Sequence, residues 1–312
     1  PPSIASPSSS HAAIATEWLS DFHAPTVDLD ERIRGGSAIL QHQANCPFKA
    51  FSIIRLNATP LAEPEHGLNA ATRGILVHRV LETLWAELGD QQHLLALNQH
   101  ALNQCIDSHV TQALAEQAPA LSIQPFFLTL EHTRLTRLVQ AWLALEKERP
   151  PFTVVSQESE HRIHIGQLHI RVKIDRIDRT TQGSRLLIDY KTGDTTLHGW
   201  FGERLEQPQL PLYCAFTQQE ATHAISFAEV RTNRSRFNGI ASTSHTDLPT
   251  DITALGHTKA TDATDWTTLL DRWRTAMESV SHEFTQGLAT VTPHSAAACR
   301  HCHLQSFCRI AS

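Results

Sequence analysis

The stretch LLIDYKTG, residues 186–193, decides the fold. Three apolar residues lead into Asp189, Tyr190 and Lys191, and Gly193 ends the pattern. A short apolar run bounded by a glycine is typical of a buried strand. Side chains alternate along a strand, so Asp189 and Lys191 point the same way. The sequence therefore predicts a strand at 185–191 that carries a carboxylate and an ammonium group to the edge of a core.

The preceding stretch LHIRVKID, residues 168–175, alternates strictly. Its even positions are apolar, and its odd positions are polar and finish on Asp175. Antiparallel pairing through a turn near Gln182-Gly183 would bring Asp175 close to Asp189. Asp178 competes for the acidic role, but it lies three residues on and hence on the other face of a regular strand. We therefore favour Asp175.

The remaining pattern predicts an α/β (α+β) fold, with a central mixed sheet flanked by helices. The first half is mainly helical, and two strands at 153–165 and 167–178 precede the one at 185–191. We expect helices from a Ser37 cap through Phe51, from Gly74 through Trp85, at about 93–117, 128–147 and 206–218, and from Trp266 through Met277. A strand near 224–231 and a polar loop at about 238–264 complete the prediction.

We expect one folded domain at 35–312. It divides into a helical part at about 37–150, a catalytic core at about 151–235, and a C-terminal helix and cluster segment at about 265–310. The chain begins without Met, and its opening is rich in Pro and Ser. Such composition is typical of linkers, so we interpret residues 1–34 as the tail of a longer protein.

Composition excludes some classes of protein. With 41% hydrophobic and 19% charged residues and a net charge of −6, the chain is not one that coats nucleic acid through global positive charge. A local basic cluster at Arg231, Arg234 and Arg236 remains available for phosphates or as a solvated loop. The sequence has no apolar run long enough for a membrane helix and no secretory signal. We expect a cytoplasmic protein without a membrane partner.

Two aspartates and a lysine at convergent strand ends indicate metal-assisted phosphoryl chemistry. Mg²⁺ and Mn²⁺ take oxygen ligands, typically carboxylates together with substrate phosphates. A lysine beside such a metal can orient a water or stabilise a phosphate. The alternative is an ordinary surface ion pair between Asp189 and Lys191, because same-face Asp/Lys pairs are common on strands.

Five segments in order carry a family resemblance. They are QANCPFKAF (43–51), GILVH (74–78), IDRID (174–178), IDYKTG (188–193) and QLPLY (209–213). Their order and spacing resemble the RecB/AddB-type branch of the PD-(D/E)XK nuclease superfamily, over roughly residues 35–310. The resemblance implies a restriction-endonuclease-like core and residues with defined roles. It implies a metal held by His78, Asp175, Asp189 and the backbone carbonyl near Tyr190, with Lys191 catalytic and Gln209 and Tyr213 positioning DNA or supporting the site.

The function that the resemblance implies is hydrolysis of DNA phosphodiester bonds. We expect a metal-dependent exonuclease acting on single-stranded DNA or DNA ends in repair and recombination. It would be the nuclease part of an AddB-like helicase–nuclease with a partner subunit. Two alternatives stay open: a non-catalytic DNA-binding or scaffold module stabilised by a cluster, and a stand-alone end-processing exonuclease like those of CRISPR adaptation.

Cysteines near the C-terminus indicate a second metal site. Cys299-x2-Cys302-x5-Cys308 supplies three thiols, and Cys46 beside Pro47 is the first candidate for a fourth. Such spacing suits a zinc ion or an iron–sulfur cluster, and His301 and His303 could replace thiols in a zinc site. The resemblance implies a [4Fe-4S] cluster. We interpret the isolated Cys105 and Cys214 as packing residues.

Overall fold

The computed structural model describes residues 22–28, 31, 33–61, 67–121, 125–217, 221–243, 247–261 and 263–310. Most of the predicted linker at 1–34 lies outside these residues. Among the described helices, none has both the length and the apolar character that crossing a membrane requires.

One mixed sheet forms the centre of the described chain, with its strands in chain order from β1 to β6. β1, β2 and β3 form an antiparallel meander, β3 and β4 are parallel, β4 and β5 are antiparallel, and β5 and β6 are parallel. The strands are β1 (Phe152–Ile165), β2 (Leu168–Thr180), β3 (Arg185–Lys191), β4 (Ala224–Glu229), β5 (Arg236–Ala241) and β6 (Ile252–Ala254). The predicted strands at 153–165, 167–178 and 185–191 and the mixed α/β class are confirmed.

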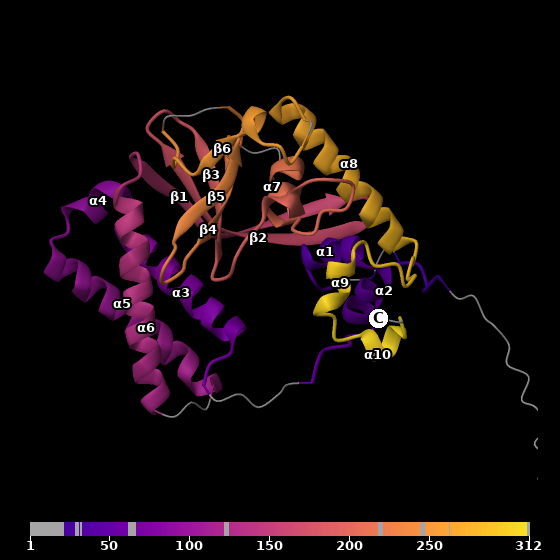
Figure 1. The fold of residues 1–312 in the computed structure, drawn as a ribbon, viewed down its shortest axis with the longest axis horizontal. Coiled ribbons are helices and arrows are strands. Elements are labelled where there is room, and N and C mark those ends of the chain that lie inside the picture. Colours follow the sequence, from indigo (N-terminus) through magenta and orange to yellow (C-terminus); the bar gives the residue numbers. More distant parts are fainter. Residues whose placement is uncertain are drawn as a thin grey trace, which may run out of the picture.

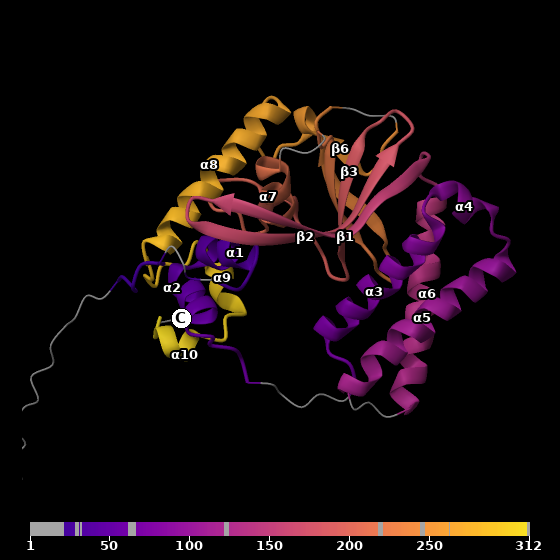
Figure 2. The same ribbon diagram turned by 180° about the vertical axis from the view of Figure 1, so that it is seen from behind.

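Helices cover both faces of this sheet (Figures 1 and 2). One face carries α3 (Ala70–Leu88), α4 (Gln91–Ala96), α5 (Gln99–Leu121) and α6 (Pro125–Lys147), and the other carries α1 (Ala38–Asn45), α7 (Gln209–Phe216) and α8 (Trp266–Thr285). Each face has its own apolar core. Leu187 packs in the core that includes Trp273, and its neighbour Ile188 packs in the core that includes Trp142. Both faces of β3 are thus buried, which explains its continuous apolar run.

Two helix starts differ from the prediction. Ser37 has helical dihedral angles and its side chain makes no capping bond. The first helix also breaks at Cys46, because Pro47 begins a separate helix, α2 (Pro47–Ala50), followed by a π-helical turn at Phe51–Arg55. α3 begins before Gly74, because the side chain of Asn69 accepts a bond from Thr72 N at 2.8 Å and caps the helix there.

The predicted polar loop at 238–264 is wrong in part, because β5 and β6 occupy positions within it. Gly239 explains the close packing of β5. A side chain there would place its Cβ 2.4 Å from the carbonyl oxygen of Ile225 on β4, a distance that no real contact allows. These strands are hard to recognise in the sequence because β6 has only three residues, and because Asn238 and Gly239, residue types that are rare in strands, interrupt the apolar residues of β5.

A buried cluster of four charges joins the sheet to α6. Arg176 on β2 binds Asp178 (Nε to Oδ1, 2.6 Å) and Glu146 on α6 (Nη1 to Oε1, 2.7 Å). Arg149 binds Asp178 as well (Nη2 to Oδ2, 2.8 Å). Arg176 also donates to the hydroxyl of Tyr190 on β3, at 3.1 Å. We call these four charged residues the Arg–acid cluster; its two positive and two negative charges balance.

The first and last described segments run side by side. Ala24 N donates to Gly287 O at 2.7 Å, Val27 N to Thr285 O at 2.9 Å, and Ala289 N to Phe22 O at 2.9 Å. Gly287 has φ +78°, and a Cβ there would lie 2.0 Å from the Ala24 carbonyl oxygen, so only glycine fits this approach. We call this pairing the terminal clasp.

Removing one member of the Arg–acid cluster should destabilise the fold strongly. Arg176→Met leaves Glu146 and Asp178 buried with too few partners, a change that typically costs about 3–5 kcal/mol. Chemical denaturation should show this loss in the free energy of unfolding. Arg79→Met removes exposed pairs to Glu82 and Glu116 and should change the stability far less. Equal losses in the two variants would contradict the role of the cluster.

Candidate active site

Two aspartates lie where the paired stretch of β2 and β3 ends. Arg176 pairs with Ile188 in the antiparallel ladder, so Asp175 and Asp189 come next on the two strands. The Asp175 carboxylate accepts a hydrogen bond from the backbone N–H of Tyr190, with 2.7 Å between Oδ2 and N. Pairing of the two strands thus brings Asp175 against the segment that holds Asp189.

Asp189 and Lys191 point to the same side of β3, as the alternation predicts. Lys191 Nζ lies 2.5 Å from Asp189 Oδ2. The aspartate is 2% exposed, whereas 38% of the lysine side chain is exposed. The buried carboxylate is therefore held by an ammonium group that also reaches solvent.

His78 reaches the same point from the helical half of the chain. Its Nδ1 lies 3.3 Å from Asp175 Oδ2, and its Nε2 lies 2.9 Å from the backbone carbonyl oxygen of Tyr190. It sits near the middle of α3, whose neighbouring apolar side chains are buried beside the sheet. An imidazole, a carboxylate and a backbone carbonyl thus converge, a set of groups that suits a divalent cation.

Glu158 is a further acidic residue at this point that the sequence analysis did not single out. The ligand atoms of Glu158, His78 and Asp175 all lie within 4.8 Å of one another. In the β1–β2 ladder it falls between the pairs Gln157–Arg176 and Ser159–Ile174, hence opposite Asp175. Its φ of +47° is unusual for a residue with a side chain. Glu158 can be identified only from the register of β1 against β2. The polar residues around it on β1 do not reveal that register.

Two carboxylates at this site, Asp189 and Glu158, have a raised pKa. Burial raises the pKa of Asp189 to about 6; Lys191 opposes that rise and the charge of Asp175 adds to it. Burial also raises the pKa of Glu158. For His78 burial favours the neutral ring, but the hydrogen bond and charge of Asp175 outweigh it and raise the pKa. A bound cation would relieve this excess of negative charge.

Asp178 lies away from this centre. Its carboxylate belongs to the Arg–acid cluster and is fully buried between Arg149 and Arg176. The preference for Asp175 therefore agrees with the positions of the two side chains. The charge on Asp178 is neutralised by guanidinium groups, which leaves it with a structural role.

Gln209 and Tyr213 take different surroundings although they lie one turn apart on α7. Gln209 Nε2 donates to the carbonyl oxygen of Lys173 at 2.8 Å, and the residue lines a cavity of about 270 Å³ together with Asp189 and Lys191. Tyr213 is 1% exposed, and its ring packs edge-on against His161 with 4.8 Å between centroids. The structure brings Gln209, and not Tyr213, to the carboxylate–lysine cavity.

The four predicted cysteine ligands line one small cavity. Cys46 lies between α1 and α2, Cys299 on α9 (Ala296–Arg300), Cys302 just after it, and Cys308 on α10 (Gln305–Cys308). These helices lie together in both views (Figures 1 and 2). All four are free, half-buried thiols. Burial and then the charges of the other three raise the pKa of Cys299, so the thiols are close enough to interact.

His301 and His303 are exposed and do not line the cysteine cavity. His303 Nε2 instead lies 2.9 Å from the carbonyl oxygen of Ala58. The donor set at the cavity is therefore four sulfur atoms.

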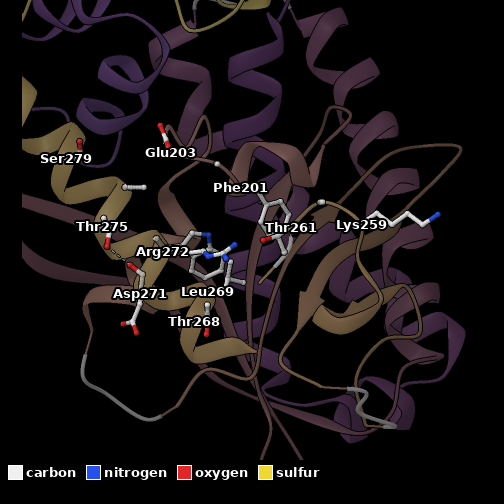
Figure 3. A pocket seen from close by; sticks show the side chains of 14 residues that line it. Phe201, Glu203, Lys259, Thr261, Thr268, Leu269, Asp271, Arg272, Thr275 and Ser279 are labelled. Carbon is white, nitrogen blue, oxygen red and sulfur yellow. Dashed lines mark hydrogen bonds between the residues drawn. The ribbon is translucent and has the colours of Figure 1, made fainter. Parts of the chain in front are cut away.

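A much larger cavity of about 1040 Å³ lies elsewhere (Figure 3). It is bounded by residues 201–203, residues 259–261 and the outer face of α8. Thr268, Asp271 and Arg272 project from that helix toward it. None of the predicted site residues lines it, so cavity size does not mark the centre described above.

Comparisons with known proteins identify the superfamily of the chain. The family model of the PD-(D/E)XK nuclease superfamily matches residues 38–309. The chain matches no curated protein. A solved structure described as "Crystal structure of SSO0001" is similar at 13% identity and a TM-score of 0.27, with 86% of this chain and 94% of that chain covered.

The raised pKa of Asp189 predicts how stability depends on pH in the metal-free protein. Below about pH 4 the carboxyl is protonated in both the folded and the unfolded chain. As the pH rises from about 4 to about 6, the unfolded chain has lost this proton while the folded chain still holds it, so the free energy of unfolding falls and then levels off. Denaturation of wild type and Asp189→Asn between pH 4 and 8 should show the steeper fall in wild type. Parallel profiles would contradict the assigned burial of this charge.

Proposed function

Because this chain belongs to the PD-(D/E)XK nuclease superfamily, we propose that it is a divalent-metal-dependent deoxyribonuclease. Its active centre would lie where the paired stretch of β2 and β3 ends. The observation that carries the proposal is the convergence of His78, Asp175 and the Tyr190 carbonyl at one point. Three chemically different ligands from α3, β2 and β3 meet there, beside a buried Asp189.

The residues present fit Mg²⁺ or Mn²⁺. His78, Asp175, Asp189 and the carbonyl of Tyr190 would hold the ion, and Glu158 lies within reach of it. A cation bound there would lower the pKa of a water molecule and neutralise charge on the scissile phosphate. The raised pKa of Asp189 supports this assignment, because it reflects a carboxylate that lacks enough positive charge around it.

Lys191 has two tasks in this proposal. Its ammonium group holds the Asp189 carboxylate in place at 2.5 Å. Because its side chain is partly exposed, the same group can bind a phosphate oxygen or the attacking water. Gln209 borders the same cavity with an amide that is fixed to β2, so it would position the substrate. Tyr213 would support the site indirectly, through the packing of α7 on β1.

Basic residues beside the active centre support DNA as the substrate. A cavity of about 440 Å³ is lined by Arg134, Arg231 and Arg234. Thr192 and Asp194, which lie one and three residues after Lys191, line the same cavity. Arg231 pairs with Asp194, and Arg236 is held by Glu229 at 2.9 Å. Exposed Arg234 is thus the best placed of the three predicted arginines to meet a phosphate.

We further propose exonuclease action on single-stranded DNA or DNA ends, within an AddB-like helicase–nuclease that serves repair and recombination. The ordered motifs and the four cysteines that line one cavity, which we call the thiol quartet, support this role. For the quartet we propose a [4Fe-4S] cluster held by Cys46, Cys299, Cys302 and Cys308. Four converging thiols without a histidine fit such a cluster, and binding it would join the first helices to the last ones.

Removal of the central charges should abolish cleavage. Asp189→Asn and Lys191→Ala should each lower Mg²⁺- or Mn²⁺-dependent DNA hydrolysis by roughly 10³-fold or more, since charge stabilisation here contributes several kcal/mol. Cleavage of end-labelled DNA measures the rate. Asp271→Asn and Lys259→Ala, at the remote cavity, are matched controls that should keep full activity. Undiminished cleavage by both central variants would overturn the assignment.

Loss of one thiol should remove the cluster. Cys302→Ser in anaerobically purified protein should lose bound iron and the broad absorbance near ~400 nm that marks a cluster. Cys105→Ser, which alters a thiol outside the quartet, should keep both. Stoichiometric zinc without iron in wild type would favour the alternative zinc site.

A further inference from the structure

A third group of side chains that could hold a metal ion lies between α3 and α5, away from both sites described above. Glu87 comes from the last turn of α3, and Cys105 and His109 lie one helical turn apart on α5. A carboxylate oxygen, a thiol sulfur and an imidazole nitrogen from these residues all lie within 4.8 Å of one another. Residues four positions apart on a helix share a face, and here that face meets α3.

The contacts within this group converge on the carboxylate. His109 Nε2 lies 3.0 Å from Glu87 Oε2, and Cys105 Sγ lies 3.8 Å from Glu87 Oε1. His109 is 8% exposed, and its Nδ1 is buried without a partner among the described residues. Cys105 is half-buried, whereas 63% of the Glu87 side chain is exposed. The group therefore has a rigid inner side and an outer side open to ions from solvent.

We propose that Glu87, Cys105 and His109 bind one zinc-class divalent cation. Thiolate, imidazole and carboxylate are the donors that zinc prefers, whereas Mg²⁺ and Ca²⁺ require oxygen. On binding, the Cys105 thiol gives its proton to solvent. The thiolate, the carboxylate and the neutral imidazole then balance the two positive charges of the cation. Three protein ligands leave the fourth tetrahedral position to water.

The thiol distinguishes this group from an ordinary ion pair. His93 and Asp90 also form a histidine–carboxylate contact, with Nδ1 2.8 Å from Oδ1, at the start of α4. Among the described residues no third ligand joins that contact, and Asp90 is explained as the cap of α4. In the α3–α5 group the same kind of contact is joined by a soft donor, which makes it selective for zinc over the hard cations that suit the nuclease centre.

Bound zinc would clamp α5 to the helix that carries His78. Because α3 positions His78 against Asp175, the cation would fix this helix from the outside. The inference does not depend on the proposed nuclease activity, and its test uses binding and not catalysis.

Zinc content measures the site directly. Iron-loaded protein is equilibrated with buffered Zn²⁺ in the presence of excess Mg²⁺, which occupies hard-cation sites, and zinc and iron are then counted by elemental analysis. Wild type should hold about one zinc more than Glu87→Gln, Cys105→Ser or His109→Gln. Zinc should bind these variants about tenfold more weakly or worse. His93→Gln, which alters a histidine–carboxylate contact without a thiol, should bind zinc as wild type does.

Glu87→Gln keeps the inference falsifiable, because Glu87 is exposed and its amide preserves the packing of both helices. Zinc should also raise the midpoint of thermal unfolding of wild type and His93→Gln but not of the three site variants. Equal zinc content and equal thermal shifts in all five proteins would overturn the proposal. A loss in His109→Gln without a loss in Cys105→Ser would overturn the thiol as a ligand.

Discussion

The contact between Arg176 and Asp178 fixes the geometry on which the rest of the molecule depends. These two residues follow Asp175 on β2, and their charges are matched by Glu146 and Arg149 from the end of α6. Arg176 also reaches the hydroxyl of Tyr190, whose N–H holds Asp175 and whose carbonyl meets His78. Burying four charges is tolerable only when each is paired. The pairing therefore fixes the backbone on both sides of the active centre.

The two layers of helices supply different residues to the proposed site. The layer of α3 to α6 supplies His78 and Glu146 of the Arg–acid cluster, so it determines where the proposed metal ligands meet. The layer of α1, α7 and α8 supplies Gln209 and packs behind the strands. The helices α2, α9 and α10, which carry or adjoin the four cysteines, lie at the margin of this second layer (Figure 1). Loss of a cluster from the quartet should therefore leave the carboxylate geometry largely intact.

Much of the fold was predictable because its central strands obey simple periodicities. Alternation placed Asp175 and Asp189 on adjoining strands, and the apolar run before Asp189 identified a strand buried on both faces. The position of a side chain relative to segments far away in the sequence was not predictable. Glu158 is identified only by the β1–β2 register, and Tyr213 lies in the core although its helical spacing matched Gln209. The strands β5 and β6 were missed because β6 is very short and because Asn238 and Gly239 interrupt the apolar residues of β5.

The terminal clasp also has a mechanical consequence. Its backbone bonds join residues 22–28 to residues 285–289, and Phe48 and Asn45 bond to Thr290 and His294 just beyond. If a motor or a neighbouring domain pulled on both ends of the chain, the load would fall first on the terminal clasp. The sheet and the proposed active centre lie between the two clasped segments in the sequence, so tension would bypass them. The terminal clasp would therefore shield the proposed active centre from tension along the chain.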